Sequence, residues 1–200
     1  GTNVVLKLKW GKPSEELIVK EAYPTLKFAL GENVKQSNRT LLPGRPQRYP
    51  ATRMGANALI RSELMRAKDY MAAWDHYEQL KKSKNPLADL LRGKLIARCH
   101  AYVAPEMIEF LNLSREFGFK IGAFEHAWEA YKITNELKAA GVGISVFIDS
   151  WAYKMEAAEG IAYNAAYCTQ KGILVSINSD SGERIRRLFN EAGKAVKYGL

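Results

Sequence analysis

Residues 95–150 read LIARCHAYVAPEMIEFLNLSREFGFKIGAFEHAWEAYKITNELKAAGVGISVFIDS, and this stretch decides the fold. Short apolar runs at 95–97, 119–124 and 142–148 are separated by longer segments in which apolar residues recur at helical spacing and which end at a glycine. The short runs do not alternate apolar with polar residues, which is typical of strands that are covered on both faces. The stretch therefore predicts an α/β fold with parallel strands and outer helices.

The same pattern continues to the end of the sequence. A helix is expected over 155–170, closed by Gly172, followed by a strand over 173–177 and a last helix that reaches about Tyr198. Residues 95–200 thus contain four successive βα units of similar length. Equal units favour a partial or distorted TIM (β/α) barrel over a doubly wound sheet, although periodicity alone does not separate the two.

The first half of the chain is less regular, and we expect the whole of 1–200 to form one partial barrel domain. Its expected elements are a half-exposed strand at 4–10, a strand at 25–30, a long basic loop at 33–50 and a long helix at 51–82 that is broken at Asn85-Pro86. Long loops in compact domains are usually functional or disordered.

Composition excludes several classes of protein. With 47% hydrophobic and 26% charged residues, the 200-residue chain can bury a core, which excludes general disorder. Two cysteines are too few for a disulfide scaffold or a paired CxxC metal site. No apolar run has membrane-spanning length and these residues contain no leader, so we expect a soluble protein that has no membrane partner. These residues leave its compartment, cytoplasmic or periplasmic, open.

The net charge of +9 is concentrated in one segment. No acidic residue lies between Glu32 and Glu63, whereas six basic residues do: Lys35, Arg39, Arg45, Arg48, Arg53 and Arg61. Such a segment is expected to be a solvated loop or the wall of a site for an anionic substrate or partner. Only Tyr49 is interleaved with it and no nucleic-acid module pattern is present, so nucleic-acid binding is not expected.

Polar residues follow each apolar run of the second half: His100, His126, Asp149 and Asp180. In a parallel barrel these positions share the carboxyl-terminal face, so side chains distant in sequence converge there. Two neutral imidazoles and a carboxylate form a ligand set that a catalytic Zn²⁺ favours. The alternative is that each is a hydrogen-bonded structural residue. His76, in the long helix, has no such placement and is expected at the surface.

Several segments resemble the metal-dependent amidohydrolases, in particular their imidazolonepropionase-like branch. They are Cys99-His100-Ala101-Tyr102, Glu125-His126, residues 176–181 (SINSDS), the tail 190–199 (NEAGKAVKYG), and residues 30–35 and 50–55. The resemblance implies a distorted TIM barrel with one or two divalent metal ions, most simply Zn²⁺. It also implies that metal-activated water hydrolyses amide or cyclic-amide bonds of small-molecule or peptide-like substrates.

Carried over by position, the resemblance makes His100 and His126 metal ligands from the fifth and sixth barrel strands. Asp180, from the eighth, would bind metal and act as the general base. Lys27 is a candidate for the carbamylated bridging lysine of some members, with Glu32 or no bridge as alternatives. Three aromatic residues near the strand ends are candidates for substrate contact, with structural packing as the other reading: Tyr102, Trp151 and Tyr153.

The sequence departs from the family in one respect. The His-x-His pair of the first barrel strand is absent, because the histidines are His76, His100 and His126. We therefore expect an internal or C-terminal part of a longer hydrolase, or a degenerate member, with weak metal affinity by itself. Open sheet edges would favour a homo-oligomer or association with a complementary segment.

Two other functions remain open. One is a non-catalytic (β/α) binding module whose basic loop engages an anionic partner. The other is a phosphate-binding barrel, which is disfavoured because Asp180 stands where the anion would bind.

Overall fold

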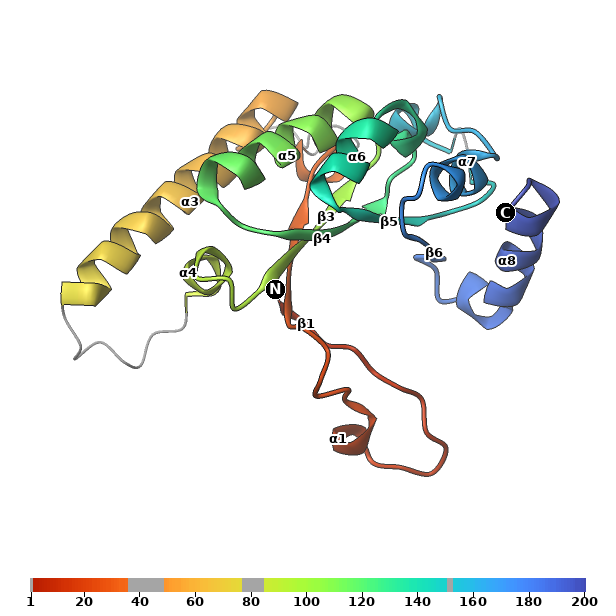
Figure 1. Ribbon diagram of the computed structural model, residues 1–200, viewed down its shortest axis with the longest axis horizontal. Coiled ribbons are helices and arrows are strands. Elements are labelled where there is room, and N and C mark those ends of the chain that lie inside the picture. The colour runs from red at the N-terminus through yellow and green to blue at the C-terminus, as the bar shows by residue number, and fades with distance from the viewer. Residues whose placement is uncertain (1, 36–48, 77–84, 151–152) are drawn as a thin grey trace, which may run out of the picture.

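The computed structural model describes residues 2–35, 49–76, 85–150 and 153–200. Its sheet has the order β1-β2-β3-β4-β5-β6; β1 is antiparallel to β2, and the other pairs are parallel (Figure 1). The strands are β1 (Thr2–Asn3), β2 (Thr25–Ala29), β3 (Ile96–Ala101), β4 (Ile121–His126), β5 (Gly143–Val146) and β6 (Val175–Ile177). Consecutive strands are neighbours without a reversal of order, as in a barrel rather than a doubly wound sheet.

Helices follow the strands and cover one face of the sheet, where α3, α5 and α6 lie together in Figure 1. The α-helices are α1 (Ser14–Leu17), α2 (Glu32–Lys35), α3 (Arg53–His76), α4 (Pro86–Leu91), α5 (Ala104–Phe117), α6 (Thr134–Ala140), α7 (Asn164–Gln170) and α8 (Leu188–Lys197). Among the described residues there are also three 3-10 helices, which are η2 (Ala130–Lys132), η3 (Met155–Ala157) and η4 (Arg184–Arg187). The α/β class with outer helices is therefore confirmed. None of the helices in these described ranges is long and apolar enough to cross a bilayer.

The helix ends follow the signals in the sequence. α5 and α6 end at Gly118 and Gly141, whose φ angles of 76° and 65° lie in the left-handed region that glycine adopts at little cost. α4 begins at Pro86, and the Asn85 side chain accepts hydrogen bonds from the backbone N–H groups of the first turn. The predicted break at Asn85-Pro86 is thus the start of a capped helix.

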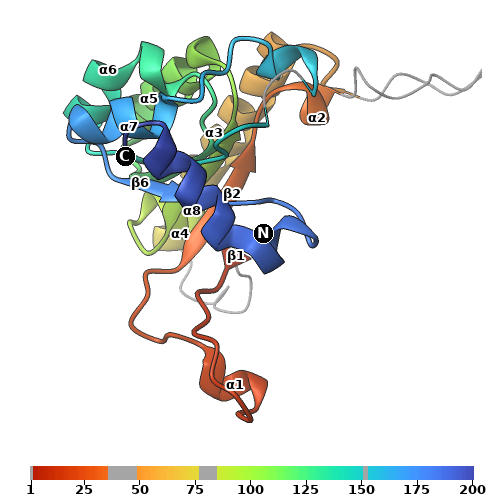
Figure 2. The ribbon, with the colours of Figure 1, turned by 90° about the vertical axis from the view of Figure 1, so that its right-hand side faces the viewer.

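The two faces of the sheet differ in character. Ala97, Cys99 and Phe124 point toward the helices and belong to the main hydrophobic core. On β3, the alternate residues Arg98 and His100 point to the opposite face, which no helix layer covers in Figure 2. The sheet therefore has an apolar, helix-covered face and a polar open face.

The expected strand over 4–10 is wrong. The structure has only an isolated bridge between Leu6 and Ile18 there, within a hairpin-like excursion that carries α1 away from the sheet (Figure 2). Leu8 and Trp10 are almost fully exposed. The alternation in the sequence has no layer to pack against, so the segment does not join the sheet.

The expected helix over 155–170 is interrupted. The structure contains η3 and α7, separated by a loop around Gly160, because Gly160 packs directly on the Trp128 indole. The expected loop over 33–50 already begins inside α2, and its residues 36–48 lie outside the described part of the chain. The expected helix over 51–82 is observed to His76, and 77–84 lie outside as well.

Candidate active site

The histidines at the carboxyl ends of β3 and β4 lie against each other. The ring centroids of His100 and His126 are 4.6 Å apart with the planes at 75°, and both side chains are buried. In the parallel register, Ala101 is the partner of His126, so the two histidines are neighbours at one end of the sheet. Residues 26 positions apart in the sequence thus share one location.

His126 holds an unusual backbone conformation. Its φ is 68°, and that of Ala127 is 36°. A non-glycine residue in the left-handed region costs about 1–3 kcal/mol and persists only where its surroundings fix it. The turn ends β4 and aims the imidazole toward His100 rather than along the strand alternation.

Aromatic rings enclose the pair. Phe147 stacks on His126 with 4.7 Å between centroids, and Tyr102 lies 5.3 Å from His126 and 5.1 Å from His100. Phe147 and Tyr102 are themselves buried. The imidazoles are therefore held in fixed orientations by packing.

Burial keeps both imidazoles neutral. It lowers the pKa of His100 to about 3, with further lowering by the charges of His126, Lys154 and Lys27. Burial also lowers the pKa of His126 to about 4, although Asp180 acts in the opposite direction. Neutral imidazole is the form that coordinates a metal ion.

One ring nitrogen of each histidine lacks a hydrogen-bond partner. These atoms are His100 Nε2 and His126 Nδ1, and both are buried. Buried polar atoms normally have a partner, and an unsatisfied one costs about 1–3 kcal/mol. Two such nitrogens on adjacent neutral imidazoles fit the requirement of a divalent cation for electron-pair donors.

Asp180 approaches the pair from the segment after β6. Its Oδ2 lies 3.8 Å from His126 Nε2, and its side chain is 67% exposed. The segment is anchored because the Asn178 N–H donates to the Val146 carbonyl (3.0 Å) and the Asn178 amide donates to Ser145 Oγ (2.9 Å). Asp180 has a φ of 42°. The carboxylate thus faces both His126 and solvent.

The described residues fit a metal ion in part. They contain no group of three or more His, Cys, Asp or Glu side chains arranged to hold one. The donor types and the two unpartnered nitrogens suit Zn²⁺, whereas Asp180 lies beside Nε2 of His126, on the other side of the ring from the unpartnered Nδ1, and does not complete a ligand cluster.

Lys27 lies on the open face of the sheet, below the histidines. β2 pairs Ala29 with His100 and Lys27 with Arg98, so Lys27 is one pleat further from the carboxyl end. Its side chain is exposed, and its charge lowers the pKa of both histidines. Arg98, its neighbour, forms an ion pair with Glu125 on β4.

Two of the three predicted substrate-contact residues contact each other beside the histidine pair. The hydroxyl groups of Tyr102 and Tyr153 are hydrogen-bonded to each other, whereas Trp151 lies outside the described residues. Sequence reasoning missed Lys154, whose ammonium nitrogen lies 3.8 Å from the Tyr102 ring centroid, and Phe147. Phe147 lies within an apolar run and Lys154 lies in a loop, so neither has a spacing that indicates the site.

A buried carboxylate ties the loop after β2 to the loop after β5. The Glu156 side chain is fully buried; its Oε1 lies 2.5 Å from Lys154 Nζ, and its Oε2 accepts the Glu32 N–H at 2.9 Å. Gly31 makes this approach possible, because a Cβ there would lie 2.5 Å from Glu156 Oε2. Glu156 thereby fixes Lys154 over Tyr102.

Other residues singled out in the sequence lie elsewhere. Asp149 forms an ion pair with Lys194 of α8, with 2.7 Å between Oδ2 and Nζ. Among the basic residues, Arg53 pairs with Glu106 and Arg61 with Glu116, which ties α3 to α5. Arg39, Arg45 and Arg48 lie outside the described residues. No observation on the described residues favours the binding-module alternative.

Comparison with known proteins gives two relatives, and no family model matches the chain. The chain is 27% identical over 195 residues to amidohydrolase tasK of Hapsidospora irregularis. The alignment covers 88% of this chain and 19% of tasK. It superposes on the crystal structure of an amidohydrolase from Thermotoga maritima with a TM-score of 0.79 and 29% identity, covering 93% of this chain and 49% of that one. The chain thus spans at most half the length of either relative. Both likenesses support the amidohydrolase superfamily.

Proposed function

We propose that this chain carries part of the active site of a metal-dependent amidohydrolase of the imidazolonepropionase-like branch. Its reaction is the hydrolysis of amide or cyclic-amide bonds in small-molecule or peptide-like substrates. The observation that carries the proposal is the contact between two buried, neutral imidazoles, each with an unpartnered nitrogen, at the carboxyl end of a parallel sheet. The likeness to two amidohydrolases supports the reaction class.

His100 and His126 would hold a divalent cation, most simply Zn²⁺, with Asp180 as a further ligand. Such a cation supplies a Lewis acid that polarises the scissile carbonyl and lowers the pKa of water. Asp180 accepts the proton of the attacking water at its carboxylate and delivers it to the leaving nitrogen. Its exposure and its position beside His126 suit this role.

We assign the remaining roles as part of the same proposal. Lys27, if carbamylated, would bridge two ions. Tyr102 and Tyr153 would contact the substrate through their hydroxyl groups, together with Trp151. Lys154, fixed by Glu156 over the Tyr102 ring, adds a cation close to both tyrosine rings.

The ligand set is completed from outside the described residues. In the described part of the chain, β6 is one edge strand of the sheet, and the other edge is the two-residue β1, which pairs with β2. Unpaired strand edges favour pairing with another segment. We propose that a complementary segment or a second copy of the chain supplies further ligands there.

Metal titration tests the proposed ligands. The purified chain is titrated with Zn²⁺ against a chromophoric chelator, alongside His100→Ala, His126→Ala and a control, His76→Ala. We expect weak binding that either site substitution abolishes and His76→Ala leaves unchanged. Equal affinity in all four proteins would refute the assignment.

The hydrolytic role is tested with Asp180→Asn in the protein that holds the full ligand set, assayed against N-acyl amino acids and cyclic amides. Loss of a general base lowers kcat by about 10²–10⁴-fold. Metal content is measured in parallel to separate loss of the base from loss of the ion. Hydrolysis at the unsubstituted rate in a metal-loaded variant would contradict the role of Asp180.

A further inference from the structure

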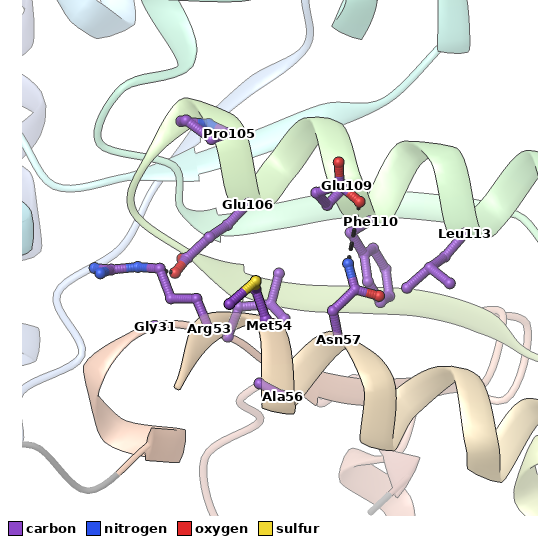
Figure 3. Close-up of a pocket in the computed structure, with 11 residues that line it drawn as sticks. Gly31, Arg53, Met54, Ala56, Asn57, Pro105, Glu106, Glu109, Phe110 and Leu113 are labelled. Atoms are coloured by element: carbon purple, nitrogen blue, oxygen red, sulfur yellow. Dashed lines mark hydrogen bonds and ion pairs between the residues drawn. The ribbon is translucent and has the colours of Figure 1, made fainter. Parts of the chain in front are cut away.

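A cavity lies between α3 and α5, on the helix-covered side of the sheet (Figure 3). Its volume is about 390 Å³. Apolar side chains that belong to the core or pack beside it form much of its wall: Leu30, Ala56, Phe110 and Leu113. None of the residues proposed for hydrolysis lines it. This cavity is therefore an apolar compartment that the proposed function does not use.

A second, acidic hollow of about 630 Å³ adjoins the first and shares Arg53, Pro105 and Glu106 with it. Five glutamates and two cations line this hollow: Glu32, Glu106, Glu129, Glu156 and Glu159, with Lys35 and Arg53. Three of these glutamates are paired with lysines outside the lining: Glu129 and Glu159 with Lys132, and Glu156 with Lys154. Glu106 is therefore the carboxylate that favours a positively charged occupant over an anion.

Glu106 lies where the two hollows meet, and it is incompletely paired. Only 7% of the residue is exposed. Its Oε1 accepts a hydrogen bond from Arg53 Nε, whereas its Oε2 is buried and has no hydrogen-bond partner. Burial raises the pKa of Glu106, and Arg53 opposes this shift. A buried carboxylate oxygen with no donor is costly, and a donor from a ligand would remove that cost.

We propose that the two hollows form a binding site for an organic ammonium ion with an apolar body. The ammonium group donates a hydrogen bond to Glu106 Oε2, and the apolar body fills the cavity between α3 and α5. A bare metal ion does not suit the site, because Arg53 occupies the other carboxylate oxygen and the cavity wall is apolar. This site is separate from the proposed hydrolytic centre and goes beyond that function.

The test uses 2-phenylethylammonium as the probe and neutral 2-phenylethanol as its isostere. Binding to the full chain is measured by calorimetry in the presence of EDTA, which keeps metal at the histidines out of the comparison. A charge-assisted hydrogen bond should make the ammonium bind at least about tenfold more tightly than the alcohol. Equal binding of the two probes, or no binding of the ammonium, would overturn the proposal.

Substitutions locate the site. Glu106→Gln should weaken ammonium binding at least about tenfold, whereas Glu116→Gln, which breaks the other Arg–Glu pair between α3 and α5, should leave it unchanged. Ala56→Leu fills the cavity and should abolish binding of both probes. This variant tests the site independently if Glu106→Gln does not fold. His100→Ala should have no effect. Loss of binding in His100→Ala or Glu116→Gln, with Glu106→Gln unaffected, would reject this location.

Discussion

The imidazole of His126 is stacked on the phenyl ring of Phe147, with 4.7 Å between ring centroids and 27° between planes. Phe147 follows β5, so the next strand along the sheet supplies the surface against which the β4 histidine is held. The contact accompanies a strained backbone, since His126 has a φ of 68°. Packing from a neighbouring βα unit therefore maintains a conformation that the local chain disfavours.

Phe147→Ala should lower the free energy of unfolding by about 3 kcal/mol, because it leaves a cavity beside His126 and Trp128. Urea unfolding followed by circular dichroism gives the measurement. Phe189→Ala is the matched control, since Phe189 is 73% exposed and its removal should change stability by less than about 0.5 kcal/mol. Equal effects of the two substitutions would contradict the packing role of Phe147.

Gly31→Ala should destabilise the protein more than Gly11→Ala. Both glycines have positive φ, 82° and 72°, so both substitutions cost about 1–2 kcal/mol in backbone strain. Only Gly31 also has a neighbour in the way, because its Cβ would displace the buried Glu156 carboxylate. We expect a further loss of about 2 kcal/mol at Gly31. Thermal melts of the two variants compare them, and equal losses would show that Glu156 moves aside freely.

Gly160→Ala should destabilise the loop after β5 severely. A Cβ at Gly160 would lie 1.6 Å from Trp128 Nε1, which donates a hydrogen bond to the Ala157 carbonyl at 2.9 Å. Displacing a buried indole costs about 3 kcal/mol through overpacking and the lost hydrogen bond. Gly182→Ala, with open space around its Cβ position, should be neutral. Chemical unfolding distinguishes them, and a neutral Gly160→Ala would disprove this packing.

Stability should fall as the pH drops below 6. The pKa values of His100 and His126, about 3 and 4 in the folded protein, lie below the usual 6.5 because of burial and the charges of Lys154 and Lys27, which Asp180 opposes only at His126. The unfolded chain therefore takes up protons first. Each imidazole then removes on the order of 1 kcal/mol of stability per pH unit between pH 6 and pH 4.

Urea unfolding in EDTA at pH 7, 6 and 5 measures this slope. His100→Gln should reduce it, because one of the two titrating groups is removed. A slope that is the same in His100→Gln and the unsubstituted protein would show that other groups cause the pH dependence.

Much of the fold could be predicted from the sequence because its signals are local. The glycines after α5 and α6, the Asn85-Pro86 start of α4 and the short apolar strands each specify their own structure. The prediction of a strand over 4–10 was wrong because alternation predicts a strand only where a second layer exists to cover it. The prediction of one helix over 155–170 was wrong because Gly160 packs against Trp128, which is a contact between segments distant in sequence.

For the candidate site, the sequence indicated which residues follow the strands but not how they are held. His100 and His126 meet because parallel register aligns the ends of β3 and β4. Asp149 occupies an equivalent position after β5, yet it pairs with Lys194 of α8. The difference depends on the position of Lys194, which cannot be predicted from the spacing of residues along the sequence. The roles of Phe147 and Glu156 likewise depend on contacts across the sheet.

Because β6 lies at the sheet edge, the proposed proton acceptor is held less firmly than the proposed metal ligands. The imidazoles lie on β3 and β4, which have neighbours on both sides, whereas Asp180 follows a three-residue strand that, in the described part of the chain, pairs with β5 alone. Edge strands open before the interior of a sheet. Fraying of β6 would move Asp180, the proposed proton acceptor, away from His126 and leave the two imidazoles in contact. The proposed ion binding and the proposed hydrolysis would then respond differently to temperature and denaturant.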